Sequence, residues 1–369
     1  MDITTRNFFR LLRAGAFGTQ EEIEPLSAWK WKRIYQLSIM QGVSALVYDG
    51  VQQCSSQFFV QLPAGLKDEW ERTTQQIDQK SHTTRDQLPQ LFDTFSRQQL
   101  RPILFNTLIM SLNYDRPTHR LAESIDIFFP FATQGRKADE WAQANGTPTP
   151  SKENHVFSYQ WNNTEAKHYH QMLRLTNKLH NHTLQSIIEK SIRESSPTFL
   201  TIDGVRIETL NPTLTLLLLL LQISQFVLNE GVPLMLLVDL GVYLRKVGDK
   251  IDFIQLQEWI DKLRLGRMAQ LSGVLLTNLL KFTDDEIPFM NPKGRKDLKR
   301  VMDELFQLRR SQQNEWYFQQ GKDTFVHTVN SSAMFWQVRH SARYFRYYPT
   351  ESFTNLFAAF AHSLTHIEE

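Results

Sequence analysis

Two polar side chains, two residues apart in the segment SIDIFF, are the strongest candidates for chemistry in this sequence. Ser124 and Asp126 alternate there with apolar residues, a pattern that predicts a β-strand carrying both on one face. Glu123, one position earlier, is expected on the opposite face. Many phosphoryl-transfer enzymes hold magnesium ions with two carboxylates on one strand face. Here only Asp126 is acidic, so the segment supplies half of such a pair.

The elements around this strand predict an α+β fold. Apolar residues recur at helical spacing through the first hundred residues, and a long helix over 66–100 is expected to bend or break near Pro89 and to end before Pro102. Short apolar runs between turn-forming segments follow, and helical periodicity returns from Asn211. We therefore expect a small mixed-sheet core between an N-terminal helical region and a C-terminal helical domain, at 101–204, 1–100 and 205–369 respectively.

Individual elements can also be assigned from local pattern. Strands are predicted at 102–105, 125–129, 155–161 and 198–202, and a helix at 135–144. In the last part of the chain, helices are predicted at 213–229, 233–246, 253–265, 268–282, 295–310, 332–347 and 352–364.

Composition excludes several broad classes of protein. The 369 residues include 41 Lys and Arg against 39 Asp and Glu, which argues against nucleic acid as a partner. A single cysteine, Cys54, rules out an internal disulfide and fits a reducing compartment, so we expect a cytoplasmic protein. The start lacks the pattern of a secretory signal, and the apolar stretch 214–221 is too short to cross a bilayer. We expect a buried helix there and no membrane partner.

Residues around Asp126 also match a known motif in order and spacing. The motif has the form Tyr-Pro-x-Pro-x-x-Arg followed by Gly-Asp-Ile-Asp, and the chain keeps Tyr114, Pro117, Arg120, Ile125 and Asp126. Segments upstream, from Trp31 to Val43, and downstream, from Leu221 to Asp239, match as well. Over about residues 25–245 the sequence resembles the uncharacterised bacterial nucleotidyltransferases of the polymerase-beta-like superfamily.

The resemblance implies a nucleotidyltransferase-like fold and, in an active member, magnesium held by Asp126. The family's Lys-Gly falls on Asn106 and Thr107, which places these two residues at the phosphate end of a nucleotide site. Arg120 would either bind anions or brace its turn. The first motif aspartate falls on Ser124, and the best alignment of a third carboxylate falls on His168.

The downstream motif is incomplete too. Its two histidines fall on Gln222 and Gln225 and its arginine on Met235, whereas the segment Glu230 to Val232 and Asp239 match.

Three functions therefore remain open. The first is a catalytically inactive or weakened nucleotidyltransferase homologue with a degenerate site at Asp126 and Ser124, whose cleft binds a nucleotide or another small anionic ligand. The second is a noncatalytic scaffold that binds a protein partner through its C-terminal helical domain. The third is an active magnesium-dependent nucleotidyltransferase that uses Asp126 with an acidic residue from elsewhere.

Two other clusters have both a functional and a structural interpretation. His168 and His170, and then His180 and His182, could ligate zinc, but no cysteine or carboxylate completes the usual spacing, which favours structural roles. Arginines and aromatic residues alternate within 335–349 and could contact nucleic acid or a protein partner over Arg339 to Tyr348. A terminal helix that packs its aromatic side chains on a core gives the same pattern, and we favour that interpretation.

Overall fold

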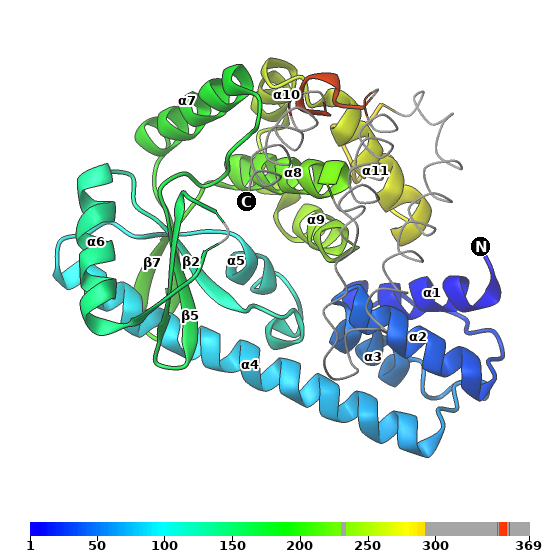
Figure 1. Ribbon diagram of the computed structural model, residues 1–369. Helices are drawn as coiled ribbons and strands as arrows, with labels where there is room; N and C mark the ends of the chain where they lie inside the picture. The colour runs from blue at the N-terminus through cyan, green and yellow to red at the C-terminus, as the bar shows by residue number, and fades with distance from the viewer. Residues whose placement is uncertain (152, 230–233, 292–344, 346, 353, 355–369) are drawn as a thin grey trace, which may run out of the picture. The chain divides into compact units, whose positions relative to one another are not determined.

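The computed structural model describes residues 1–151, 153–229, 234–291, 345, 347–352 and 354 (Figure 1). Contacts between residues divide the chain into two compact units. The first contains Met1–Met172, Ile188–Leu216 and Val238–Ile251, and the second contains Leu173–Ile187, Leu217–Leu237 and Asp252–Glu369.

Four helices begin the first unit: α1 (Ile3–Phe17), α2 (Ala28–Met40), α3 (Ser44–Gln53) and α4 (Ala64–Arg97). Helices α1 and α3 pack with their backbones in close contact at two glycines. A Cβ atom added to Gly15 would lie 1.8 Å from the Leu46 carbonyl oxygen, and one added to Gly50 would lie 1.9 Å from the Leu11 carbonyl oxygen. Only glycine at both positions allows this approach.

Helix α4 runs without interruption through Pro89 (Figure 1). The expected break at this proline is therefore wrong, and the helix ends at Arg97, before the expected boundary. A proline inside a helix removes one backbone hydrogen bond. Leu88, Leu91 and Phe92 around it are at most 1% exposed, and their burial holds both sides of the proline in one helix.

The first unit also contains a seven-stranded mixed sheet in the order β3-β4-β5-β2-β1-β7-β6. Its strands are β1 (Ile103–Leu104), β2 (Ser124–Phe128), β3 (Thr147–Thr149), β4 (Val156–Trp161), β5 (Thr164–Tyr169), β6 (Thr198–Ile202) and β7 (Val205–Thr209). Strand β2 pairs parallel with β5 and antiparallel with β1, and β1 pairs parallel with β7. The predicted strands β1, β2, β4 and β6 are confirmed, and so is the α+β class.

Three strands lie outside the predicted ones, and one of them is β5, which pairs with β2. Strand β3 falls where no strand was predicted, and its two threonines pair with the edge of β4 despite the proline between them. Strand β7 continues the sheet to Thr209, beyond the predicted core boundary at Gly204.

Register decides which side chains share a face of this sheet. In the parallel pair of β2 and β5, Ser124 lies beside Glu165 and Asp126 beside Lys167, whereas Ile127 lies beside His168. One face is therefore polar near the middle of the sheet. On the other face, α4 and α6 (Ala132–Asn145) cover the apolar side chains, and the ring of Phe95 lies 5.4 Å from those of Phe129 and His168.

Short helices connect β1 to β2, namely α5 (Thr107–Ser111) and the 3-10 helix η1 (Pro117–His119). Later elements are α7 (Lys178–Glu194), α8 (Pro212–Asn229), α9 (Leu234–Val247), η2 (Gly248–Lys250), α10 (Phe253–Lys262) and α11 (Gly266–Leu280). Helices α8 to α11 confirm four of the predicted helices. The predicted helices at 295–310, 332–347 and 352–364 lie wholly or mostly outside the described residues.

Helix α8 is long and apolar enough to span a membrane by length and composition alone, and within the described residues it is the one helix that meets this test. Buried residues make up 72% of that span, and Leu216 to Leu221 are at most 4% exposed. Burial of this kind is typical of a core helix, as the sequence predicted.

Candidate functional site

The site is built around Asp126, near the middle of β2. Its side chain is buried, with the residue 4% exposed. The Ser124 hydroxyl donates a hydrogen bond to Oδ1 at 2.8 Å, and the Asn106 amide donates one to Oδ2 at 3.2 Å. The predicted strand face is thus observed, and three of the predicted site residues meet in it. Both carboxylate oxygens already have protein partners.

Burial dominates the electrostatics of this carboxylate. It raises the pKa of Asp126 to about 6, while the Ser124 hydrogen bond, the charge of Lys167 and the Asn106 amide each act to lower it. An aspartate with such a pKa is ionised in only part of the protein near pH 6, which is unusual for this residue.

Three residues of β5 belong to the same face of the sheet, namely Glu165, Lys167 and Tyr169. Together with Ser124 and Asp126 they form what we call the Asp126 face. The Lys167 ammonium lies 3.2 Å from a Glu165 carboxylate oxygen, and both side chains are partly exposed. Burial and the nearby charge of Asp126 raise the pKa of Tyr169. Sequence reasoning missed Glu165, Lys167 and Tyr169, although their alternation with Ala166 and His168 was a usable signal.

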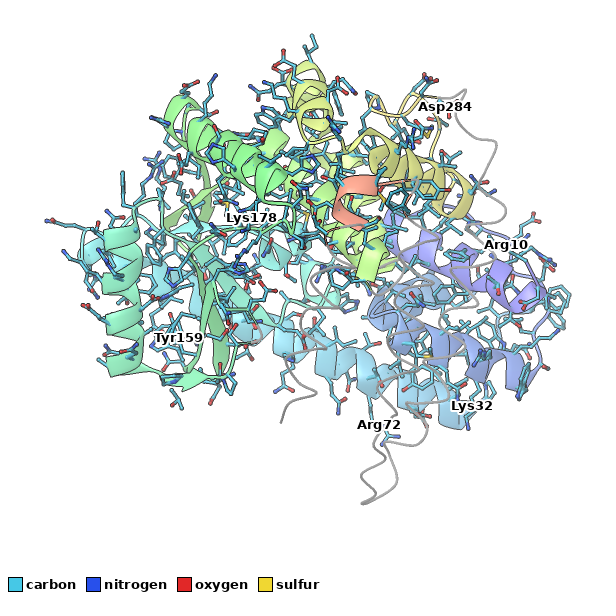
Figure 2. The ribbon with its side chains drawn as sticks, turned by 45° about the horizontal axis from the view of Figure 1, so that its top comes forward. Arg10, Lys32, Arg72, Tyr159, Lys178 and Asp284 are labelled. Atoms are coloured by element: carbon cyan, nitrogen blue, oxygen red, sulfur yellow. The ribbon has the colours of Figure 1, made fainter. Side chains whose placement is uncertain are left out.

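His168 does not occupy the position of a third carboxylate beside Asp126. It lies on the opposite face, where its Nδ1 is 2.9 Å from Asp139 and its Nε2 is 3.0 Å from the Tyr159 hydroxyl. Burial lowers the pKa of His168. The expectation that His168 lies beside Asp126 is therefore wrong. His168 is one position further along β5 than the partner of Asp126, and one position on a strand changes the face. Tyr159 marks this buried side of the sheet in Figure 2.

Asn106 and Thr107 lie where β1 passes into α5. Asn106 has a φ of 62°, a positive value that glycine adopts readily and that is uncommon for other residues. The family's glycine was aligned with Thr107, so the unusual backbone conformation occurs one residue earlier. It directs the Asn106 amide to Asp126, and the proposed contact of both residues with phosphate stays a prediction.

The motif residues that the chain retains form a separate buried cluster, the Tyr114–Arg120–Asp239 triad. Asp239, on α9, accepts hydrogen bonds from the Tyr114 hydroxyl at 2.7 Å and from the Arg120 guanidinium at 3.1 and 2.5 Å. Arg120 also donates to the Leu121 carbonyl oxygen. These are the contacts of a residue that braces its turn, and anion binding by Arg120 stays a prediction.

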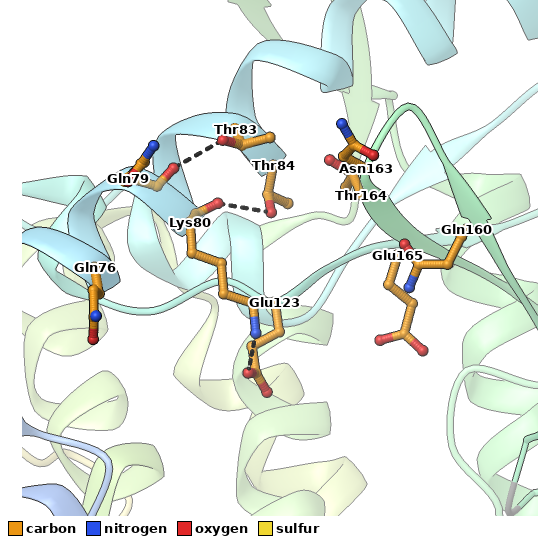
Figure 3. Close-up of a pocket in the computed structure, with 10 residues that line it drawn as sticks. All are labelled: Gln76, Gln79, Lys80, Thr83, Thr84, Glu123, Gln160, Asn163, Thr164 and Glu165. Carbon is orange, nitrogen blue, oxygen red and sulfur yellow. Dashed lines mark hydrogen bonds and ion pairs between the residues drawn. The ribbon is translucent and has the colours of Figure 1, made fainter. Parts of the chain in front are cut away.

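A polar pocket of about 500 Å³ lies between α4 and one end of the sheet (Figure 3). Lys80 of α4 forms an ion pair with Glu123 there at 2.6 Å, and Glu165 lines the same pocket. Glu123 immediately precedes β2 and pairs with α4, so its predicted place on the opposite face of that strand stays a prediction. The other lining residues are mostly amides and hydroxyls: Gln76, Gln79, Thr83, Thr84, Gln160, Asn163 and Thr164.

The residues on the Asp126 face do not fit the magnesium ions that the family resemblance implies. Two-metal sites need several carboxylate oxygens free to coordinate. Here Asp126 already accepts two hydrogen bonds, Glu165 pairs with Lys167, and the Lys167 side chain adds positive charge. Across the described part of the chain, no group of three or more His, Cys, Asp or Glu side chains is placed to hold a metal.

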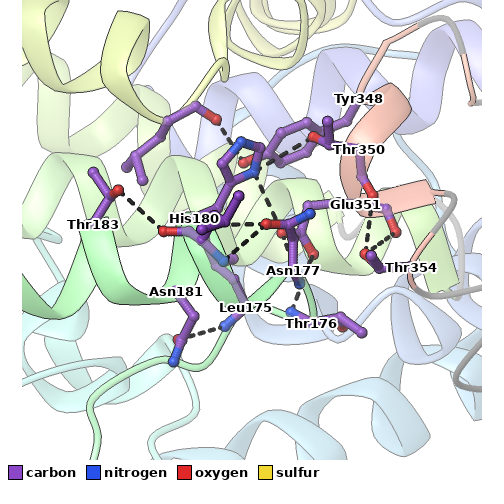
Figure 4. A network of polar contacts seen from close by, with 12 residues as sticks. Leu175, Thr176, Asn177, His180, Asn181, Thr183, Tyr348, Thr350, Glu351 and Thr354 are labelled. Atoms are coloured by element: carbon purple, nitrogen blue, oxygen red, sulfur yellow. Dashed lines mark hydrogen bonds and ion pairs between the residues drawn. The ribbon is translucent and has the colours of Figure 1, made fainter.

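His180, one of the histidines for which zinc ligation was considered, has protein partners in the second unit. His180 on α7 stacks on Tyr348, with ring centroids 5.9 Å apart, and its Nδ1 lies 3.6 Å from Glu351 (Figure 4). Glu351 also accepts hydrogen bonds from the backbone N–H groups of Thr176 and Asn177. Within the first unit, His168 and His170 both contact Asp139. These contacts match the structural interpretation of the histidines.

Of the downstream motif, Gln222 and Gln225 lie on α8 and Met235 on α9, while the segment 230–232 is outside the described residues. The Gln225 amide donates a hydrogen bond to the Arg174 carbonyl oxygen. The aromatic and arginine segment at 335–349 is also largely outside them, except for Phe345 and residues 347–349. Contact of Arg339 to Tyr348 with nucleic acid or a protein partner stays a prediction.

A mixed sheet with a strand that carries Ser124 and Asp126 on one face is the arrangement that the sequence resemblance predicted. A family model described as "Uncharacterised nucleotidyltransferase" matches residues 27–281, and the chain belongs to this family. The match covers the predicted resemblance and extends beyond it to α11. A search of curated proteins found no match.

One solved structure with similarity to the chain is an antigenic nucleotidyltransferase-like protein from Paracoccidioides brasiliensis. The two are 13% identical with a TM-score of 0.36, and the similarity covers 55% of this chain and 93% of the other. A similarity of this size adds nothing to the family assignment.

Proposed function

We propose that this chain is a catalytically inactive or strongly weakened nucleotidyltransferase homologue that binds a nucleotide or another small anionic ligand at the Asp126 face. The proposal rests on one observation above all. Where the family motif has its first aspartate, Ser124 donates a hydrogen bond to Asp126 instead of presenting a second carboxylate. Without that carboxylate, one ligand is missing for the metal ions that would neutralise the charge that develops during phosphoryl transfer.

Each predicted site residue has a role in this proposal. Asp126 fixes the Ser124 hydroxyl and the Asn106 amide, and Thr107 begins α5 beside them. Asn106 and Thr107 lie nearest the phosphates of the ligand, and Arg120 braces the turn that leads into β2. We also propose a cytoplasmic location, supported by the single buried Cys54.

Thermal unfolding with nucleotides tests this function. The purified chain is heated with each nucleoside triphosphate, with magnesium and with EDTA. A ligand at one hundred times its Kd should stabilise the protein by about 2.7 kcal/mol, which gives a clear rise in Tm. Asp126→Ala should reduce the rise, whereas Asp93→Ala, at an exposed position on α4, should not. No rise with any nucleotide would count against the proposal.

Release of pyrophosphate from the same nucleotides separates the alternatives. We expect none above the background of a heat-denatured sample. Magnesium-dependent release that Asp126→Ala abolishes would establish an active transferase in place of the proposed function. If neither binding nor release occurs in a folded sample, the scaffold function is favoured.

A further inference from the structure

Lys167 lies beside Asp126 on the neighbouring strand. The two residues are register partners in the parallel pair of β2 and β5, and partners in such a pair project from the same face. Asp126 is buried, whereas the Lys167 side chain is 27% exposed. The ammonium group therefore extends from a buried carboxylate towards solvent, on the face where the family's metal ions would be expected.

Lys167 is the one group on the Asp126 face that would attract an anion, since the other two ionisable groups beside it, Asp126 and Glu165, are carboxylates. Both oxygens of the Asp126 carboxylate accept hydrogen bonds, from Ser124 and Asn106, so neither oxygen depends on a metal ion for a partner. A metal ion beside Asp126 would also be repelled by the Lys167 ammonium. A phosphate group would be attracted by the same ammonium, and lysine commonly binds phosphate as a point charge.

Glu165 gives this lysine an exchangeable partner. Its carboxylate oxygen lies 3.2 Å from the Lys167 ammonium, and its side chain is 29% exposed. A single ion pair that is partly open to solvent is weak, so a phosphate with more charge can displace the glutamate. The pair would hold Lys167 in place until a ligand arrives.

We propose that Lys167 takes the place of a metal ion on the Asp126 face, so that this chain binds the di- or triphosphate group of its ligand without magnesium. The inference rests on the proposed function, because it names the cation that meets the ligand. It also names the ligand chemistry: a polyphosphate group, either free or carried by a nucleoside.

Binding measurements on the full chain test the proposal. Calorimetric titrations with ATP and with inorganic triphosphate are made in EDTA and in magnesium. We expect both ligands to bind in EDTA, with ATP tighter if the nucleoside is recognised. Lys167→Met should weaken binding at least tenfold, Lys167→Arg less than threefold, and Glu165→Gln should strengthen it. Lys80→Met is the matched control, since it removes a lysine of the adjacent pocket, and should leave the Kd unchanged.

A second measurement uses the unaltered protein and does not depend on the folding of any variant. Acetylation of lysines is followed by mass spectrometry in EDTA, with and without saturating ATP or triphosphate. We expect the ligand to protect Lys167 from acetylation and to leave Lys80 unprotected. Equal reactivity of Lys167 with and without a bound ligand would overturn the inference.

The outcomes separate the two proposals. Nucleotide binding that requires magnesium and is indifferent to Lys167→Met overturns the inference and leaves the proposed function standing. Binding in EDTA that is lost in Lys80→Met also overturns it, because the ligand then lies in the pocket beside α4. Failure of a folded protein to bind ATP or triphosphate under either condition overturns both.

Discussion

Removal of Asp239 should destabilise the protein far more than removal of an exposed aspartate in the same region. In the Tyr114–Arg120–Asp239 triad, the Arg120 and Asp239 side chains are 8% and 0% exposed. Asp239→Ala leaves the Arg120 guanidinium buried without its counterion. Loss of one partner of a buried pair costs about 3–5 kcal/mol. In domains of 150–250 residues this corresponds to a fall in Tm of about 6–20 °C.

The ion pair of Asp115 with Lys246 provides the matched control. Its atoms are 2.8 Å apart, but its side chains are 80% and 53% exposed. Exposed pairs of this kind contribute about 0–1 kcal/mol, so Asp115→Ala should be nearly neutral. Both variants are compared with the parent by urea unfolding, followed by tryptophan fluorescence.

A double variant tests the physical reason for the difference. Arg120→Met with Asp239→Leu removes both charges and fills the space with apolar atoms. It should lose less stability than Asp239→Ala alone, because no buried charge is left unpaired. If Asp239→Ala costs no more than Asp115→Ala, or if the double variant is the least stable of the three, the role assigned to the triad is refuted.

Three further changes have defined outcomes. Burial raises the pKa of Asp126 from 3.8 to about 6, so the folded state binds the proton more tightly and stability should fall by ~3 kcal/mol as pH rises from about 4 to above 6. Urea unfolding should show this loss in the parent chain and not in Asp126→Asn. Gly15→Ala should strongly lower the Tm, since the new Cβ would collide with the backbone of α3. Gly65→Ala on α4 is the control: its Cβ meets no atom within 4 Å, so its Tm should be unchanged or slightly higher. Glu351→Ala removes the acceptor for two N–H groups that precede α7 and should cost about 1 kcal/mol, detectable as faster proteolysis after residue 345. Unchanged cleavage would contradict that role.

Local patterns were sufficient to locate the strand that carries Asp126. The alternation of Ser124, Ile125, Asp126 and Ile127 predicts both the strand and the face, and the hydrogen bond between Ser124 and Asp126 confirms it. Helices α8 to α11 were predictable for the same reason, because their apolar residues repeat at helical spacing.

Long-range pairing could not be derived from such patterns. The neighbour of Asp126 is fixed by parallel pairing of β2 with β5, and the register of that pair places Lys167, not His168, on its face. Motif spacing identified Tyr114, Arg120 and Asp239, but their contact depends on α9 returning to the turn before β2. The chain keeps these bracing residues while Ser124 departs from the family motif, a contrast that becomes clear only when the contacts are known.

Helix α4 packs on the N-terminal helices near its start and on the sheet near its end, although the sequence predicted these as separate parts of the chain. With 34 residues it is about 51 Å long. Near its start, the Trp70 indole donates a hydrogen bond to the Ser44 carbonyl oxygen at 3.0 Å; near its end, Phe95 packs on Phe129 and His168 beneath the sheet. A truncated chain that begins at Arg101 would expose that side of the sheet to water. The N-terminal helices and the sheet should therefore unfold in one cooperative step, with both halves of α4 losing protection from hydrogen exchange together.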